Sequence, residues 1–594
     1  MEHSCNKQYK FERLYRNFYN PEFYYLAYRN IYATPGSMTA GSDGQTIDDM
    51  SDERIQKIIQ SMRDFTYQPN PARRTYIEKK NSNKKRPLGI PSANDKLVQE
   101  IVRMILESIY EPNFSKHSHG FRPKRSCHTA LMQIQETFTG IKWFVEGDIT
   151  ACFDSFNHHV LIELLRERIA DENFIALMWK FLKAGYMEQW VHHKTLSGTP
   201  QGSGMSPILA NIYLNELDKY VLQYKEKFDT GESSTNPEYG RAASKLFYTR
   251  RRNKKNWQNM TAGEKKIAHK SQREAQQLLQ SLPSKRQNDK EYKRLQYCRY
   301  ADDFLIGVIG AKADAEKVKA DLKTFLADTL KLTLSDEKTK ITCSTDKVSF
   351  LSYDVTLSKS TKVVTSSDGR KMRACSGTVA LYVPHEKWFS KLIELKAIKI
   401  ATDTSGNEKW VPLHRGPLIN RTDIEIISKV NAEVRGLYNY YSIANNATVI
   451  KNFAFNMESS MYKTFGRKYK CSVKQIISKY SKDGRFMIPY DTKKGVKHCE
   501  FYNGGFVRQN KPRFDDFDML PQHRQYDRPN SLRARLLARK CELCGCDCEH
   551  IRMHHIKKLK DLTGTSEWER IMIAKRRKTL AVCPKCHAGI HESS

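Results

Sequence analysis

The chain has 594 residues, too many for a single hydrophobic core, so several domains are expected. Lys and Arg number 100 against 66 Asp and Glu, a formal net charge of +34, and such an excess calls for a polyanionic partner. The sequence has no long apolar span, lipidation motif or apolar signal-peptide core, which favours nucleic acid over a membrane as that partner.

The first 140 residues are expected to be mainly helical, with a basic loop in their second half. A Gly-rich stretch at residues 34–46 interrupts the early helical pattern. The basic loop, from Lys79 to Arg86, is closed by Pro87 and Gly89. Such a charge run is most often a solvated loop. The helix predicted after it carries four apolar residues on one face: Leu97, Ile101, Ile105 and Ile109.

Two further segments carry features of a nucleotide site. The apolar run in IKWFVEGDITACFDSFN (141–157) places Asp148 at the end of a predicted strand. In SGTPQGSGMSPILANIYL (197–214), glycines around Gln201 would allow close backbone approach to a nucleotide, and a helix is predicted from Ser206 to Val221. The polar insertion that follows, 225–292, contains one predicted helical stretch, KSQREAQQLLQSL.

The segment YCRYADDFLIGVIG (297–310) predicts a strand, a tight acidic turn and a second strand. Asp302 and Asp303 repel each other at this turn, which indicates a divalent cation against them. A polar hairpin tip without a metal is the alternative, since Asp is a common turn residue. If Asp148 lies beside the turn, three carboxylates can hold one or two Mg²⁺ ions and align a 3′-hydroxyl with a triphosphate.

Towards the C-terminus the sequence predicts a capped helix and then a metal site. Thr422 and Glu425 form a capping box before an amphipathic helix. Six of the 14 cysteines lie between positions 541 and 586. Two CxxC pairs have the spacing of a four-thiolate zinc site, Cys541 with Cys544 and Cys583 with Cys586. Cys546 and Cys548 leave open which thiolates complete the first pair.

Three motifs, WFVEGDITACFDSF, SGTPQGSGMSPILANIYL and RYADDF, occur in the order found in reverse transcriptases, and the chain resembles the proteins encoded by group II introns. The resemblance implies an α+β multidomain fold with the fingers, palm and helical thumb of a right-hand polymerase. The implied domains are fingers 1–140, palm 141–360 with the 225–292 insertion, thumb or maturase domain 361–465, a DNA-binding region 466–530, and a zinc-stapled nuclease domain 531–594.

The same resemblance implies roles for residues around the three aspartates. Lys79 and Arg86 would contact the triphosphate, Gln201 the sugar or base, and Phe153 the sugar C2′, so that DNA is the product. Ordinary core packing is the alternative for Phe153. Two further sets of residues are candidates: Lys338 for pyrophosphate departure, and Arg122, Lys124 and Arg125 for template phosphates. For Lys338 the alternative is an exposed loop lysine with no role.

The histidines of the tail resemble those of HNH endonucleases with a ββα-metal fold. By that match His555 is the general base, and His554, His587 and His591 hold the nuclease metal. Thr579 stands close to the place of the usual Asn. A structural zinc module that only binds DNA is the alternative.

The predicted protein is therefore an RNA-directed DNA polymerase that binds intron RNA as a splicing maturase. Its nuclease would nick the second strand of double-stranded target DNA and so provide a primer for copying the inserted intron. The implied ligands are Mg²⁺ at the polymerase and nuclease sites, structural Zn²⁺, and dNTPs. The implied location is the bacterial cytoplasm, in a nucleoid-associated ribonucleoprotein, with an organellar matrix as the less favoured alternative, and no membrane partner is implied. The alternatives are a non-catalytic RNA-binding maturase and a host-adapted reverse transcriptase without an intron.

Overall fold

A computed structural model gives the structure of the chain. It describes residues 2–592 apart from 35, 79–84, 189–190, 194–197, 199–201, 287–288, 359–362, 366–367, 370, 374–376, 403–405, 483, 493–494 and 513–530. Among the described helices, none combines the length and the apolar character needed to cross a bilayer.

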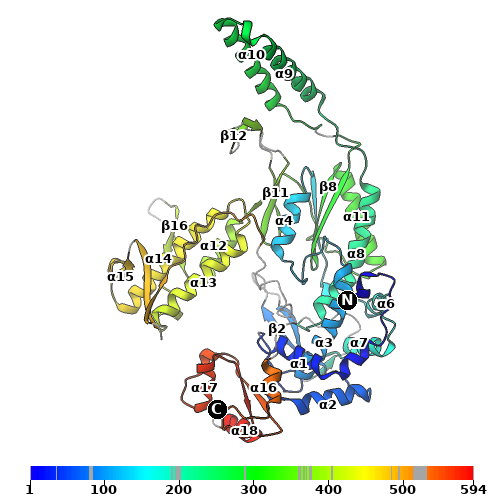
Figure 1. Ribbon diagram of the computed structural model, residues 1–594, viewed down its shortest axis with the longest axis vertical. Helices are drawn as coiled ribbons and strands as arrows, with labels where there is room; N and C mark the ends of the chain where they lie inside the picture. Colours follow the sequence, from blue (N-terminus) through cyan, green and yellow to red (C-terminus); the bar gives the residue numbers. More distant parts are fainter. Residues whose placement is uncertain are drawn as a thin grey trace.

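An antiparallel sheet, here called the central sheet, lies in the middle of the molecule (Figure 1). Its strands, in spatial order, are β7 (Arg294–Tyr300), β8 (Asp303–Ile309), β4 (Trp143–Asp148) and β9 (Ile341–Cys343). Helix α4 (Cys127–Thr137) covers one face, and α8 (Ser206–Phe228) and α11 (Lys312–Asp328) cover the other. Alternate residues of β8 enter the two cores, so the strand is apolar after Asp303.

A second sheet contains the basic hairpin, defined as β2 (Ala72–Glu78) and β3 (Lys85–Ile90), followed in the sheet by β5 (Tyr186–Glu188) and β6 (Val191–His193). The helix predicted after the basic loop is α3 (Ala93–Tyr110), with Ser92 accepting a hydrogen bond from the Asp95 N–H as its N-cap. The four apolar residues predicted for its core face are all buried.

The remaining helices of the N-terminal half pack around α3 and α8 and share one core with them. They are α1 (Pro21–Ile31), α2 (Asp52–Arg63), α5 (Cys152–Ser155), α6 (His158–Arg166) and α7 (Glu172–Lys183). The two-residue strand β1 (Met50–Ser51) precedes α2.

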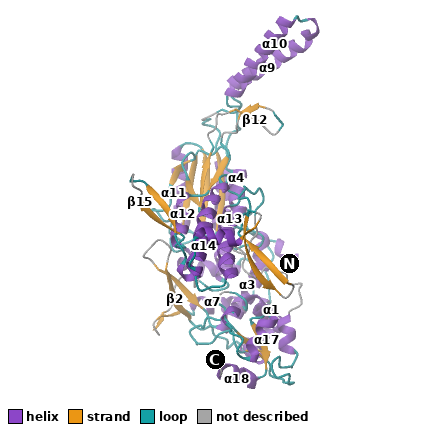
Figure 2. Cartoon of the chain, turned by 90° about the vertical axis from the view of Figure 1, so that its left-hand side faces the viewer, coloured by secondary structure: helices purple, strands orange, loops and turns teal. Residues whose placement is uncertain are grey.

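The insertion forms two antiparallel helices, α9 (Pro237–Asn256) and α10 (Ala262–Ser281), which project from one end of the molecule (Figures 1 and 2). The predicted helical stretch is the C-terminal part of α10, whereas the sequence did not predict α9. The described part of α9 buries only Ala242, Leu246 and Asn253. A helix with so small a buried face has no apolar stripe from which it could be recognised.

A unit of mixed helices and short strands, beyond the central sheet, follows in the chain. Its elements are β10 (Val348–Phe350), β11 (Tyr353–Leu357), β12 (Val363–Thr365), β13 (Lys371–Arg373), β14 (Val379–Tyr382), α12 (His385–Glu394), β15 (Ile398–Thr402), β16 (Glu408–Pro412), α13 (Asp423–Tyr441), α14 (Ile450–Tyr469), α15 (Val473–Tyr480), β17 (Ser481–Lys482), β18 (Arg485–Thr492) and β19 (Gly495–Glu500). Helix α13 begins at the predicted capping box, since Thr422 and Glu425 hydrogen-bond each other's backbone N–H.

The C-terminal unit, residues 531–592, lies against α1 and α2 at the end of the molecule opposite the α9–α10 hairpin (Figure 1). It consists of α16 (Ser531–Leu537), β20 (Arg552–His555), α17 (Glu567–Lys575), β21 (Thr579–Val582) and α18 (Pro584–Glu592). Strand β1 pairs with β20, which gives a three-stranded sheet of order β1-β20-β21. The C-terminal unit therefore shares a sheet and a core with the N-terminal region.

Replacing Thr422 by Ala removes the side chain that accepts the Glu425 N–H. We expect a local cost of about 1 kcal/mol at the start of α13. Hydrogen exchange of the backbone amides in the first turn of α13 should therefore accelerate, while Thr422→Ser should exchange like the wild type. Equal exchange in the Ala variant would show that the cap does not stabilise this turn.

Candidate active sites

The backbone places Asp148 directly opposite the acidic turn. Strands β4 and β8 pair antiparallel with Asp148 opposite Asp303, and Asp302 lies in the turn that joins β7 to β8. Ala301 adopts a left-handed conformation there, with φ of 57°. Because opposed residues in an antiparallel pair have Cα atoms about 4.5–5.5 Å apart, Asp148 and Asp303 are neighbours although 155 positions separate them.

Negative charge is concentrated at this turn. Desolvation and the charges of Asp302 and Asp148 raise the pKa of Asp303 to about 7. Burial and Asp148 also raise the pKa of Asp302, against a smaller lowering effect of Arg86. The Nζ of Lys338 lies 2.6 Å from Asp148 Oδ2. Lys338 thus acts as the counter-charge of Asp148 at a site where carboxylates outnumber cations.

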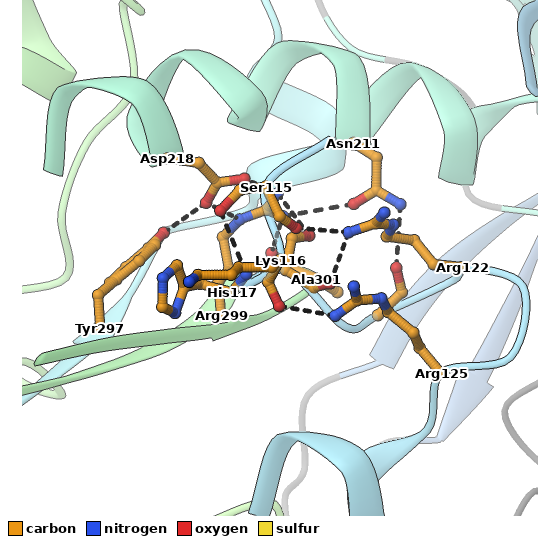
Figure 3. Close-up of polar contacts among 12 residues, drawn as sticks. Ser115, Lys116, His117, Arg122, Arg125, Asn211, Asp218, Tyr297, Arg299 and Ala301 are labelled. Carbon is orange, nitrogen blue, oxygen red and sulfur yellow. Dashed lines mark hydrogen bonds and ion pairs between the residues drawn. The ribbon is translucent and has the colours of Figure 1, made fainter. Parts of the chain in front are cut away.

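A buried ion pair holds the strand that leads into the turn (Figure 3). Arg299 donates to both carboxylate oxygens of Asp218, at 2.7 and 2.6 Å, and to the carbonyl of Ala301 at 2.8 Å. Both side chains of the pair are fully buried. Tyr297 also donates to Asp218, at 2.7 Å. Arg299 therefore ties the left-handed residue of the turn to α8.

The segment from His117 to Arg125 lies along the same turn. A Cβ on Gly120 would lie 2.4 Å from the Ala301 backbone N, so only glycine fits this position. The prediction that Arg122 grips template phosphate is wrong for this structure. Arg122 is buried and donates to Glu111 and to two backbone carbonyls, which leaves no free face for an external anion. Lys124 is exposed, while Arg125 donates to the Lys116 carbonyl.

The structure describes some of the other residues that were predicted to contact the nucleotide. Phe153 is half-buried on α5 and contacts the rings of Phe121 and Phe156. Gly202 has φ of 106° and lies against Gly89 of β3, where a Cβ would meet the Gly89 carbonyl oxygen at 2.8 Å. Lys79 and Gln201 lie outside the described residues.

The cysteines of the C-terminal unit form a thiol cluster. Sulfur atoms of Cys541, Cys544, Cys546 and Cys583 all lie within 4.8 Å of one another. Burial, and then hydrogen bonds with Cys544, Cys583 and Cys541, raise the pKa of the Cys586 thiol, so this fifth cysteine adjoins the same cluster. The group thus contains three of the four predicted ligands together with Cys546, while Cys586 and Cys548 are not part of it.

The predicted nuclease histidines lie on a strand and a helix that face each other. His554 and His555 are on β20, His587 and His591 are on α18, and Thr579 of β21 is opposite His555. Ligand atoms of His554, His587 and His591 gather within 4.8 Å, and Asp48 from the N-terminal region joins them. The ring of His555 is buried, and its Nε2 lies 2.8 Å from the Tyr28 hydroxyl. Burial lowers the pKa of His555 to about 4.

Three family models match successive parts of the chain. The reverse transcriptase (RNA-dependent DNA polymerase) model matches residues 77–236 and 246–355, and the type II intron maturase model matches 376–510. The AI2M/AI1M-like HNH endonuclease model matches 541–587, which includes both CxxC pairs and all but His591 of the histidine cluster.

Curated relatives match over nearly the whole chain. The group II intron-encoded protein LtrA of Lactococcus lactis subsp. cremoris is 45% identical over 98% of this chain and 96% of its own length. This chain belongs to the group II intron-encoded proteins. An uncharacterized 91 kDa protein in the cob intron of Schizosaccharomyces pombe is 33% identical over 97% of this chain and 69% of its own. A structure of telomerase from Candida albicans matches 73% of this chain and 65% of the telomerase chain, with a TM-score of 0.31 and 11% sequence identity.

This group II intron protein is thus a multidomain α/β reverse transcriptase with maturase and HNH endonuclease domains. Asp218 and Asp48 were not predicted from the sequence. Asp218 could have been recognised from the sequence, because it lies between the apolar residues Leu214 and Val221 on the buried face of a predicted helix. A buried carboxylate requires a partner. Asp48 could not have been recognised, since nothing in the segment TIDDMS indicates a contact with residues about 500 positions later in the chain.

Replacing Asp218 by Asn leaves the Arg299 guanidinium buried without a counter-charge. Removing one partner of a buried pair costs about 3–5 kcal/mol, so we expect a clearly lower apparent Tm and reduced primer extension. Asp336→Asn, which removes an exposed partner of Lys323, serves as the control and should melt like the wild type. Equal melting of both variants would show that the pair does not stabilise the acidic turn.

Proposed function

We propose that Asp148, Asp302 and Asp303 hold the Mg²⁺ ions of DNA synthesis. The observation that carries this proposal is the β4–β8 register, which sets Asp148 opposite Asp303. The raised pKa values of Asp302 and Asp303 fit the same reading, since a divalent cation would relieve the repulsion between these carboxylates. When bound, Mg²⁺ would neutralise triphosphate charge and favour attack by a 3′-hydroxyl.

The protein's own part in this reaction is to position the reacting groups. The central sheet would act as the palm and the basic hairpin as the fingers, with α13 and α14 in the thumb, within the domain limits given by the sequence. Arg86, whose charge acts on Asp302, would hold the triphosphate together with Lys79. Gln201 would contact the sugar or base, and Phe153 would exclude a 2′-hydroxyl. Lys338, beside Asp148, would meet the departing pyrophosphate.

The C-terminal unit supports a metal-dependent nuclease. His554, His587 and His591 are a fitting ligand set, because buried nitrogens of His554 and His587 have no hydrogen-bond partner among the described residues. The bound metal would polarise a scissile phosphate, and His555 would take a proton from the attacking water. Zinc on four thiolates of the cysteine cluster would staple a unit that is too small for a large core of its own.

These activities form one sequence on intron RNA and target DNA. The chain would hold the intron RNA through its basic surface and maturase region, and the nuclease would cut the second strand of the target. The new 3′-hydroxyl would then enter the polymerase site as primer. Both enzymes share a chain because the product of one is the primer of the other.

Replacing Asp302 and Asp303 together by Ala should abolish cDNA synthesis, since the metal would lose two of its three carboxylates. Binding and splicing of intron RNA should remain close to wild type, because these depend on basic surfaces elsewhere. Primer extension on an RNA template measures the first effect, and filter binding and splicing assays measure the second. Undiminished extension would refute the assignment of the metal site.

His555→Ala should lose second-strand cleavage and spare primer extension, since the proposed base acts only in the nuclease. His269→Ala, an exposed histidine on the projecting α10, is the matched control and should cut normally. A nicking assay on double-stranded target DNA distinguishes the two variants. Normal cutting by His555→Ala would mean that another group activates the water.

A further inference from the structure

Asp48 of the polymerase's N-terminal region lies inside the histidine cluster of the nuclease. Its Oδ2 is 2.9 Å from His591 Nε2, and its Oδ1 is 3.6 Å from His587 Nε2 and 3.7 Å from His554 Nδ1. The four residues present one ligand atom each within a sphere of metal-site size. Asp48 lies outside residues 541–587, the region that the nuclease family model matches.

The fold delivers Asp48 to this position through several independent contacts. Strand β1 pairs with β20 in a fixed register, Met50 opposite Met553. The Oδ1 of Asp48 accepts the His555 backbone N–H at 2.7 Å. Ion pairs flank the junction: Asp49 with Arg552, Glu53 with His550, and Glu22 with Arg533. Backbone pairing, a shared apolar core and charge complementarity thus all define one docked arrangement.

Part of the donor set in this cluster has no hydrogen-bond partner among the described residues. Both ring nitrogens of His554, a residue only 4% exposed, and Nε2 of His587 are buried with no hydrogen-bond partner among the described residues. A buried polar group without a partner destabilises the fold, so these nitrogens favour a bound ion. A tetrahedral zinc-type cation takes four ligands of this kind, three imidazoles and one carboxylate. This donor set therefore favours such a cation over the Mg²⁺ predicted for the nuclease from the sequence.

We propose that Asp48 is the fourth ligand of the nuclease metal, which closes the site until the nuclease undocks from the polymerase. This proposal rests on the proposed function, in which the three histidines hold that metal. A catalytic site keeps one coordination position open for water or substrate, and here a carboxylate takes the position that a phosphodiester oxygen needs. Tyr28 blocks the proposed base, His555. Its hydroxyl contacts Nε2 of the His555 ring, the nitrogen that would face the attacking water. The N-terminal region thus blocks both the metal and the base.

The metal site can be tested by Co²⁺ binding, which needs no nuclease activity. The full chain is first loaded with one equivalent of Zn²⁺ to fill the thiol cluster, and Co²⁺ is then added while visible absorption is recorded. Co²⁺ in a four-ligand nitrogen and oxygen site absorbs strongly, whereas octahedral Co²⁺ on the polymerase carboxylates absorbs weakly. Asp48→Asn should weaken this Co²⁺ binding at least about tenfold and change the band, as expected for loss of a ligand.

The control is Asp43→Asn, which neutralises an exposed carboxylate of the same loop outside the cluster and should titrate like the wild type. The Asn at position 48 keeps an oxygen for the His555 N–H, and normal primer extension checks that the variant folds. With saturating metal, Asp48→Asn should nick target DNA faster than the wild type. Wild-type Co²⁺ affinity and spectrum in Asp48→Asn, or slower nicking, would overturn the proposal.

A third variant separates this proposal from the nuclease assignment on which it rests. His587→Ala should lose the Co²⁺ band. If it does so while Asp48→Asn binds normally, the three-histidine site stands and Asp48 is excluded as a ligand. If His587→Ala keeps the band, or the wild type shows none, then the proposed nuclease metal site fails and Asp48 is only an ion-pair partner of the histidines.

Discussion

The buried pair of Arg299 and Asp218 fixes the centre of the polymerase. Asp148, Asp302 and Asp303 repel one another, so their side chains would separate if the backbone allowed it. Arg299 prevents this by binding the Ala301 carbonyl at the turn while Asp218 anchors Arg299 to α8. Because water does not reach the pair, its geometry has few alternatives. The protein itself therefore holds the acidic turn in one arrangement, as electrostatic catalysis at the proposed metal site would require.

The sequence predicted those parts of the structure that depend on neighbouring residues. The acidic hairpin, the buried face of α3 and the capping box of α13 each follow from a pattern within about twenty residues, and each is confirmed. Helix α9 was missed because it buries almost nothing. Arg122 was assigned to template phosphate because sequence gives charge but not burial. The roles of Lys79 and Gln201 stay predictions.

The two enzymes of the chain share more than a linker. The core of the C-terminal unit is continuous with that around Tyr28 and Met50, and its sheet is completed by β1. A unit of this size buries a small fraction of its surface and needs additional constraints to be stable. Zinc on the thiol cluster would provide one constraint, and docking on α1 and α2 provides another. This dependence explains why contacts 500 residues apart in sequence could not be read from either segment alone.

Charge explains why both proposed metal sites are built around carboxylates in so basic a protein. With a net charge of +34, most of the surface attracts nucleic acid backbone without any further device. A carboxylate cluster repels that backbone until a cation neutralises it, so phosphate enters only where an ion is present. At the acidic turn, the proposed cation would be shared between three carboxylates and the incoming triphosphate. In the nuclease, the proposed ligand Asp48 would have the opposite effect on phosphate. Because this carboxylate completes the coordination shell of the ion, it would exclude the phosphate from the metal.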